Sequence, residues 1–363
     1  MTDMIAAEPA FAHRLLERLG QPGGTAWRLA ALIRATAVAG RGVDVVGCGT
    51  SEHGAMGATA IIGEALARAG VAAAGCVRSV QALEAALAPQ AAGLVLAVSH
   101  EGGTWATNEA LRAARGAGVP TALITISDRS PGAALADLVV TTDEADESWC
   151  HTIGYLSPLL AATAVGAWLT DERLDPAVVR ALLADGADQV PVAESVAAGL
   201  AGCSRLVVVA SGADRAAGHE LALKVEEASY LPTVMLDLET ILHGHLPATD
   251  GTTALLVLLA DRAGRPVRAR RAGGVLAAAR AIGLPTTAIT TEEAMAGWPA
   301  GVTSLDVLRV VEAPTLPSPV AALLGSATPL QLLTERLARA RGTNPDTLRR
   351  TDARYLAAGA AVE

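Results

Sequence analysis

The sequence predicts an α/β protein made of two tandem domains, each a parallel sheet flanked by helices in a three-layer α/β/α arrangement. Short apolar runs alternate with Ala- and Leu-rich stretches, which is the pattern of strands buried on both faces between helices. The chain has 363 residues, of which 51% are hydrophobic, enough for two or three domains with cores of their own. The pattern also starts twice, because VDVVGCGTS and RLVVVASGADR each lead from a strand into a helix, with Gly47 and Gly212 at matching points.

In the first half, the apolar runs predict four strands, and the stretches between them predict two helices. The expected strands are Val43–Val46, Leu94–Val98, Ala122–Ile126 and Leu138–Thr141, and the expected helices are Gly54–Ala69 and Asn108–Gly116. Because helices separate the strands, the strands are expected to be parallel.

In the second half, helical stretches come first and a second set of strands follows. The expected helices are Tyr155–Leu169, Pro176–Leu200, Arg265–Ala281, Pro319–Gly325 and Pro329–Arg341, the last two opening with a proline, which suits the first turn of a helix. The expected strands are Leu206–Ala210, Thr233–Asp237, Ala254–Leu258, Thr286–Ile289 and Ser304–Val307. We expect an N-terminal helix and first domain at 1–172, a linking helix at 173–200, a second domain at 201–342 and a C-terminal tail at 343–363.

Composition excludes several classes of protein. The net charge of −9 argues against a nucleic-acid-binding protein. Four cysteines without a CxxC pair do not make a disulfide framework. The N-terminus lacks the pattern of a signal peptide, and the longest apolar stretch, Tyr155–Leu169, is shorter than the roughly 20 residues of a membrane-spanning helix and contains Pro158. We therefore expect a soluble, cytoplasmic protein that contacts neither nucleic acid nor membrane.

Two glycine-rich polar turns follow predicted strands in the first half. The first is GCGTS at 47–51, and the second is SHEGGT at 99–104. Turns at the carboxyl ends of parallel strands converge on one crevice, where open α/β sheets bind ligands. The first turn lacks the third glycine of a dinucleotide-binding GxGxxG, since Glu52 stands there. The alternative is that both turns only cap the helices that follow.

A third candidate segment lies in the second half, on a predicted helix. Glu220, Lys224 and Glu227 share one face by their spacing. A charged, solvated face is the usual meaning of such a pattern, but Lys224 is the only lysine in the chain. Sixteen residues after Glu227 comes the loop sequence His243-Gly244-His245. An HxH pair could bind a metal ion, but no Cys or Asp cluster nearby completes a site, so we expect no metal and no cofactor.

Together these motifs resemble the sugar isomerase (SIS) family, and especially the double-SIS isomerase half of the glutamine–fructose-6-phosphate aminotransferases. GCGTS and SHEGGT resemble the two sugar-phosphate loops, ALKVEEASY resembles the ALKxKExSY helix, and His243-Gly244 resembles the HGP turn. Glu147, before Thr152 and Tyr155, resembles an ExxVAxTKxY segment, and the segments at 329–333 and 341–346 also match. The glutaminase half and any helix-turn-helix domain have no counterpart.

The resemblance implies a role for each matched residue. Glu227 would be the base that moves a proton between C1 and C2 of a sugar, with Lys224 beside it and beside a substrate oxygen. His243 would open the sugar ring from the neighbouring subunit, so a homodimer with a shared active site is implied, and the low-charge, Ala-rich composition suits self-association. The residues expected to bind substrate are Cys48, Gly49, Thr50, Ser51, Ser99, His100, Glu101, Gly103, Thr104 and Glu147.

Three positions depart from the family pattern. Ala358 replaces the tail lysine that is associated with ring opening and imine formation. Glu101 stands where a phosphate-binding serine is expected, and a carboxylate there would repel a phosphate dianion. His245 replaces a proline. We therefore expect no Schiff base between protein and substrate, and a substrate without a phosphate at this loop, unless Glu101 turns away to cap the next helix.

Three functions remain open from the sequence. The first is a sugar or amino-sugar isomerase or deaminase that uses Glu227 as its base. The second is a non-catalytic SIS protein that senses a carbohydrate derivative, and the third is an ammonia-dependent enzyme like glucosamine-6-phosphate synthase. The retained Glu227, His243 and Lys224 favour an enzyme, while Ala358 and Glu101 favour a sensor.

Overall fold

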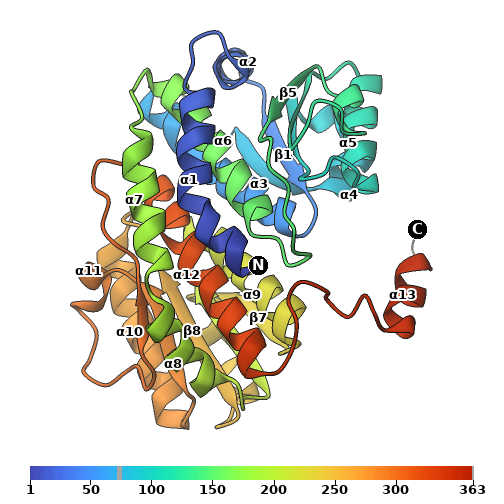
Figure 1. Ribbon diagram of the computed structural model, residues 1–363. Helices are drawn as coiled ribbons and strands as arrows, with labels where there is room; N and C mark the ends of the chain where they lie inside the picture. The colour runs from blue at the N-terminus through green and yellow to red at the C-terminus, as the bar shows by residue number, and fades with distance from the viewer. Residues whose placement is uncertain (72–75, 362–363) are drawn as a thin grey trace.

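A computed structural model of the chain describes residues 1–71 and 76–361, and it has two α/β domains, each with one five-stranded sheet (Figure 1). The first sheet consists of β1 (Val43–Gly47), β2 (Val77–Gln81), β3 (Leu94–Val98), β4 (Thr121–Thr125) and β5 (Leu138–Thr141). The second consists of β6 (Arg205–Ala210), β7 (Thr233–Asp237), β8 (Thr253–Leu259), β9 (Thr286–Thr290) and β10 (Val307–Arg309).

All neighbouring strands are parallel, and the two sheets have equivalent strand orders. The first has the order β2-β1-β3-β4-β5, and the second, read from its opposite edge, has the order β7-β6-β8-β9-β10. The predicted α/β class with two parallel sheets is therefore confirmed. The equivalent turn glycines are Gly49 and Gly212, with φ of +56° and +68°, and not Gly47 as the sequence predicted. Gly47 instead allows a close approach, because a Cβ there would lie 2.5 Å from the Ser51 carbonyl oxygen.

Helices cover both faces of the first sheet. One face packs against α1 (Thr2–Leu19), α2 (Thr25–Val38), α3 (Thr50–Arg68) and α6 (Ile153–Thr170). The other packs against α4 (Ala82–Leu87) and α5 (Trp105–Gly116). Along β3, Leu94 and Leu96 point to the first face while Val95 and Ala97 point to the second, as the alternation of side chains along a strand requires.

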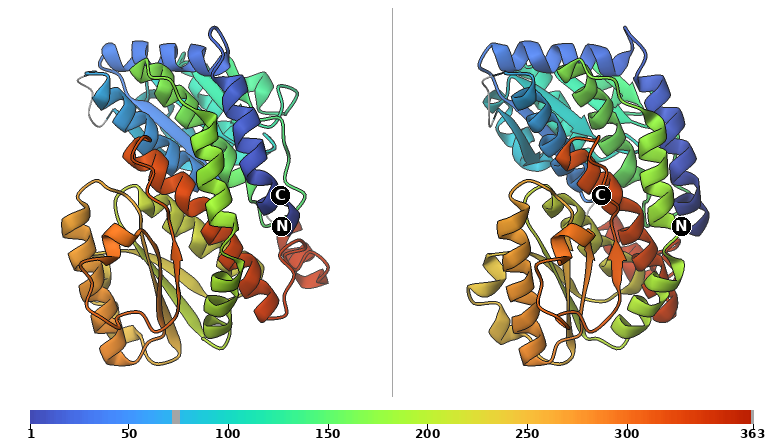
Figure 2. Two further views of the ribbon diagram at one scale, coloured as in Figure 1. Left: turned by 60° about the vertical axis from the view of Figure 1, so that its left-hand side comes forward. Right: turned by 90° about the vertical axis from the view of Figure 1, so that its left-hand side faces the viewer.

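The second sheet is covered in the same way. One face packs against α8 (Val190–Leu200), α9 (Asp214–Ser229) and α12 (Ser318–Ala340), and the other against α10 (Arg265–Ile282). The first of these faces belongs to the same apolar core as α3 and α6 of the first domain. This shared core, with α12 passing between the two domains (Figure 2), fixes the two sheets relative to each other.

Two strands were mispredicted from the sequence. The last strand is β10 at Val307–Arg309, so of the expected Ser304–Val307 only Val307 is correct. Strand β2 was not predicted at all, because VRSVQ is half polar and lies at the edge of its sheet with exposed Arg78 and Ser79. The continuous apolar runs that identified the other strands belong to positions buried on both faces.

Several helices also differ from the prediction. The expected helices at 319–325 and 329–341 are one helix, α12, with Pro329 inside it. Because α12 is buried along most of its length, tertiary packing outweighs the local penalty of the proline. The expected single linking helix consists of two helices, α7 (Pro176–Ala187) and α8. The chain starts a new helix there because Pro191 fits only the first turn of a helix. The N-terminus likewise forms two helices.

Helix α6 corrects the prediction that its apolar stretch is too short for a membrane. Its 18 residues have the length and composition of a spanning helix, but 83% of them are buried inside the protein. They pack against α1, α2 and α3, so α6 is a core helix of the first domain.

Candidate active site

The first glycine-rich turn brings the first domain into contact with α9 of the second. A Cβ on Gly49 would lie 3.9 Å from Leu223 of α9. One residue further on, the hydroxyl of Thr50 accepts a hydrogen bond from Lys224 Nζ at 2.7 Å. Since β1 and β3 are neighbours in the sheet, the second turn leaves the sheet next to the first. The candidate site therefore lies where the carboxyl ends of β1 and β3 meet α9.

Lys224 is the centre of this site. Its side chain is 1% exposed, and its ammonium group has three oxygen acceptors around it. These are Thr50 Oγ1 at 2.7 Å, Glu227 Oε2 at 2.9 Å and Glu220 Oε1 at 3.4 Å. The first two contacts are hydrogen bonds, whereas Glu220 Oε1 forms an ion pair with Lys224 and has no hydrogen-bond partner among the described residues. The shared face predicted from the spacing is confirmed, but it is buried between the domains and not solvated.

The charges of this cluster stabilise one another. Burial alone would lower the pKa of Lys224, but the carboxylate of Glu220 and the groups of Cys150 and Glu227 raise it overall. Burial alone would raise the pKa of Glu220, but the cationic Lys224 and the hydrogen bond from His53 lower it overall. Lys224 is therefore cationic and Glu220 anionic near neutral pH. A lysine held in this state donates hydrogen bonds and does not act as a nucleophile.

Glu227 is the member of the cluster that reaches solvent. Its side chain is 27% exposed, and it lines an open depression of about 490 Å³ together with Tyr230, Arg349 and Tyr355. The guanidinium carbon of Arg349 lies 3.9 Å from the centre of the Tyr230 ring, and Arg349 also hydrogen-bonds the Tyr355 hydroxyl. A small molecule in this depression would therefore lie next to the Glu227 side chain.

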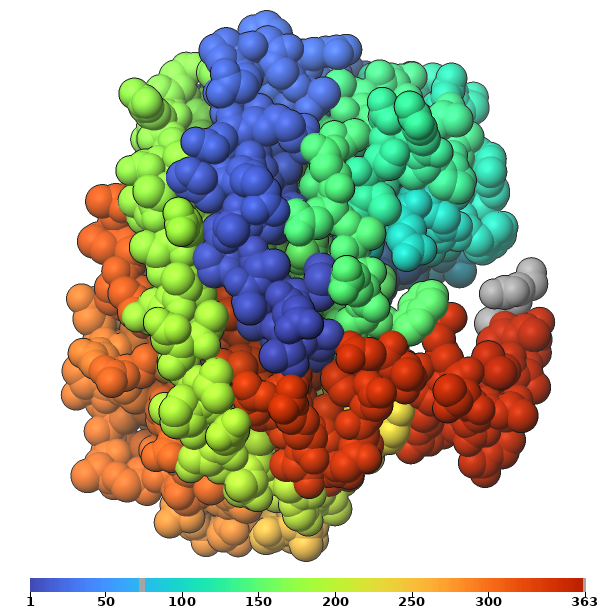
Figure 3. Space-filling view, in the orientation of Figure 1, coloured from blue at the N-terminus to red at the C-terminus, as the bar shows by residue number. Residues whose placement is uncertain are grey.

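The tail contributes only part of its length to this depression. Its helix α13 (Ala353–Ala360) has no buried residue and carries Ala358 at an exposed position. Figure 3 shows the tail extending sideways from the body of the molecule. Arg350 lies over the Trp149 ring, 3.3 Å from its centre, and ties the start of the tail to the first domain. Val362 and Glu363, at the end of the expected tail, lie outside the described residues.

The second glycine-rich turn is partly buried and partly open. Gly102 has φ +68°, and a Cβ there would lie 2.3 Å from the Ser130 hydroxyl, so the turn requires glycine. Ser99 is buried and its hydroxyl lies 3.5 Å from that of Thr104. Glu101 is exposed, and within residues 1–71 and 76–361 its side chain has no hydrogen bond or ion pair, so it does not cap α5.

His100 has a structural role that the sequence did not predict. Its side chain is buried, and its Nε2 accepts a hydrogen bond from the backbone N–H of Asp146 at 3.1 Å. Burial lowers the pKa of His100, so the imidazole is neutral. His100 therefore ties the second turn to the segment before α6 through Nε2, while its buried Nδ1 has no hydrogen-bond partner among the described residues.

Glu147, which was expected to bind substrate, lies in the segment that His100 contacts. Its side chain is exposed and has no hydrogen bond or ion pair in the described part of the chain. Its neighbour Asp146 is the buried carboxylate, which accepts hydrogen bonds from the backbone of Thr152, Ile153 and Gly154 at the start of α6. Four residues on, Cys150 is buried near Lys224, and burial raises the pKa of its thiol to about 12. The sequence could not identify Asp146 or Cys150 as buried, because both lie in an irregular segment without a periodic pattern.

His243 is not joined to the Lys224 cluster within one chain. Its side chain is 70% exposed and its Nε2 lies 3.0 Å from Glu239, which also binds Arg271. In the described residues, no hydrogen bond or ion pair links His243 to Lys224 or Glu227. The exposed loop position expected from the sequence is confirmed.

Two further histidines next to the cluster were not predicted. His53 Nδ1 lies 2.7 Å from Glu220 Oε2, and the His53 ring stacks on the His219 ring with centres 5.7 Å apart. The spacing could have identified His53, because it follows Thr50 by three residues on the same helix face. Over the described ranges, no group of three His, Cys, Asp or Glu residues could hold a metal ion.

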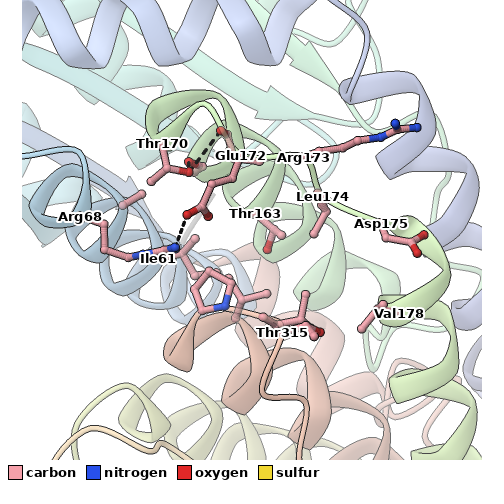
Figure 4. A pocket seen from close by; sticks show the side chains of 16 residues that line it. Ile61, Arg68, Thr163, Thr170, Glu172, Arg173, Leu174, Asp175, Val178 and Thr315 are labelled. Atoms are coloured by element: carbon pink, nitrogen blue, oxygen red, sulfur yellow. Dashed lines mark hydrogen bonds and ion pairs between the residues drawn. The ribbon is translucent and has the colours of Figure 1, made fainter.

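Another cavity, of about 270 Å³, lies where α3, α6 and the start of α12 meet (Figure 4). Most of its lining is apolar, and its polar edge includes the ion pair of Arg68 with Glu172. It contains none of the candidate residues, so we place the candidate site at Lys224.

Solved structures provide the comparison with known proteins. The C-terminal domain of glucosamine-fructose-6-phosphate aminotransferase from Francisella tularensis superimposes with a TM-score of 0.77 at 18% identity, covering 94% of this chain and 96% of that one. The chain has the tandem SIS fold. Tagatose-6-phosphate ketose/aldose isomerase from Escherichia coli matches with a TM-score of 0.73 at 16% identity, covering 95% of this chain and 94% of that one.

A third tandem SIS structure, from Silicibacter pomeroyi and described as a phosphosugar isomerase, matches with a TM-score of 0.71 at 21% identity. It covers 95% of this chain and 99% of that one. No family model and no curated protein matches the sequence. The resemblance stated from the motifs is therefore confirmed at the level of the fold.

Proposed function

We propose that the protein is a soluble, cytoplasmic enzyme that acts on a sugar or amino-sugar derivative by moving a proton between C1 and C2, as an isomerase or deaminase. The observation that carries this proposal is the Lys224 cluster. Two hydrogen bonds and an ion pair hold its cation in place, and the Glu227 side chain stays partly open to an adjoining depression. Among the tandem SIS structures that match the chain are a ketose/aldose isomerase and an aminotransferase of fructose 6-phosphate.

The chemistry follows from the charges. A carboxylate at one face of an enediol can take the proton from C2 and return it at C1. The negative charge that develops on the neighbouring oxygen needs a fixed donor, and the Lys224 ammonium is such a donor. Because Lys224 is held cationic, we propose acid–base chemistry without a Schiff base to the protein.

A non-catalytic sugar sensor is the second candidate. It is favoured by the exposed, lysine-free tail helix and by the free carboxylate of Glu101 in the second turn. An ammonia-dependent aminotransferase is a variant of the first candidate, since it needs the same base.

Glu101 predicts a preference for substrates that lack a phosphate at the second turn. We expect free hexosamines to raise the melting temperature of the wild type more than hexose 6-phosphates do, because an exposed carboxylate repels a dianion and attracts an ammonium group. Glu101→Ser is expected to reverse this order, while Glu84→Ser, a change at an exposed carboxylate on α4, should leave it unchanged. Tight binding of hexose 6-phosphates by the wild type would contradict the prediction.

His243 predicts a site shared between two subunits. We propose a homodimer in which His243 of each subunit completes the site of the other, since one chain leaves it 70% exposed and apart from Glu227. Glu227→Gln and His243→Ala chains, each inactive alone, should regain activity when mixed, because heterodimers contain one intact site. Wild-type protein that sediments as an active monomer would exclude this arrangement.

A further inference from the structure

His53 stands behind the Lys224 cluster, on the side away from Glu227. It lies on α3 of the first domain and reaches Glu220 on α9 of the second, with Nδ1 2.7 Å from Glu220 Oε2. The other carboxylate oxygen, Oε1, lies 3.4 Å from Lys224 Nζ. Glu220 is therefore hydrogen-bonded to His53 through one oxygen and ion-paired with Lys224 through the other.

The direction of the hydrogen bond follows from the charge of Glu220. The side chain of Glu220 is 0% exposed, and because its pKa is lowered it is ionised near neutral pH. An ionised carboxylate only accepts hydrogen bonds, so His53 carries a proton on Nδ1 and donates it. The side chain of His53 is 14% exposed, so this hydrogen bond competes little with water.

Removing this donor would leave a buried carboxylate oxygen with no partner. Of the described residues, only His53 hydrogen-bonds Glu220 Oε2. A buried charged group without a hydrogen bond carries the full cost of its desolvation, which favours a movement toward another partner. Any such movement of Glu220 also moves the carboxylate oxygen that lies 3.4 Å from Lys224 Nζ.

We propose that His53 is a positioning residue for Lys224: by donating to Glu220 across the domain boundary, it fixes the carboxylate that orients the ammonium group toward Thr50 and Glu227. His219 differs from it, because the His219 ring stacks on His53 but has no hydrogen bond to either carboxylate in the described residues. Both rings line the same open cavity of about 370 Å³. His219 therefore provides a matched control for the loss of an imidazole at this place.

The single lysine of the chain makes the test specific. Protein grown with lysine labelled with ¹⁵N at Nζ should give one NMR signal, from Lys224, with slow exchange of its protons because the group is buried, makes two hydrogen bonds and is ion-paired with Glu220. In His53→Leu we expect proton exchange to be at least roughly ten-fold faster, the effect of one hydrogen bond to a charged group. His53→Asn should restore slow exchange, since the asparagine side-chain nitrogen occupies the place of Nδ1, and His219→Leu should behave as wild type.

If His53→Leu does not fold, His53→Asn is compared with His53→Gln. The side-chain nitrogen of the glutamine lies farther out, near the place of Nε2, so the Lys224 protons should exchange fast in this variant. Exchange within two-fold of wild type in the variants without an Nδ1-like donor would overturn the proposal, as would an equal effect of His219→Leu. The lysine signal is measured without substrate, so it is independent of the proposed function. A second expectation does rest on the proposed function: His53→Leu should lower kcat roughly ten- to hundred-fold while KM stays within a few-fold of wild type.

Discussion

Glu227→Gln is expected to lower the rate of sugar turnover by roughly 10²–10⁴, the usual contribution of one positioned acid–base group. The amide keeps the shape of the side chain and can still accept the hydrogen bond from Lys224, but it cannot take a proton from carbon. Binding of the sugar should therefore persist. Initial rates measured beside isothermal titration of the same sugar would separate the two effects.

Glu226→Gln is the matched control for this variant. Glu226 is the preceding residue of α9 and lines the same depression, but it hydrogen-bonds the backbone N–H of Thr233 and not Lys224. We expect the turnover rate of Glu226→Gln to stay within a few-fold of wild type. Equal rates in both variants would show that Glu227 is not the base.

Lys224→Met is expected to be the most destabilising single change in the site. It leaves the buried Glu220 carboxylate without its cation, and breaking a buried ion pair in this way costs about 3–5 kcal/mol. The loss should be smaller at pH 5 than at pH 8. A buried carboxyl group without its counterion has a raised pKa in the folded state, so the protein gains stability by binding a proton as the pH falls. Thermal unfolding of wild type and variant at both pH values measures this.

Two further variants test whether the unpaired Glu220 carboxylate causes the loss of stability in Lys224→Met. Lys224→Met combined with Glu220→Gln removes both charges and should regain part of the lost stability. Arg112→Met removes a cation from an exposed ion pair with Glu109 and should change the stability by no more than about 1 kcal/mol. The explanation fails if the double variant is less stable than Lys224→Met, or if Lys224→Met unfolds at the wild-type temperature.

The sequence was most informative where burial on both faces of a sheet imposes a pattern. The continuous apolar runs of β1, β3, β6 and β8 identified the parallel sheets, and the glycine-rich turns located the sheet edge at which the candidate site lies. Strand β2, at the edge of its sheet, was not predicted, and helix α12 was predicted as two helices, because neither follows a local sequence rule. The first is half polar, and the second contains a proline that only its burial between the domains makes acceptable.

For the candidate site, spacing along one helix was enough to group Glu220, Lys224 and Glu227. It could not show that this face is buried, because burial depends on α3 of the other domain. The same reason hid His53, whose partner lies 167 positions away in the sequence. The role of Glu147 stays a prediction, and the sequence could not show that its neighbour Asp146 is the carboxylate bound to the start of α6, because both lie in an irregular segment without a periodic pattern.

The central claim is that Glu227 exchanges a proton with the carbon next to a carbonyl. The most direct measurement is the incorporation of deuterium from D₂O at C1 and C2 of a panel of sugars and amino sugars, with and without phosphate, followed by NMR. We predict that at least one compound that raises the melting temperature of the protein gains deuterium with the wild type and not with Glu227→Gln. Compounds that bind tightly but never exchange a carbon-bound hydrogen would contradict the claim and identify the protein as a sensor.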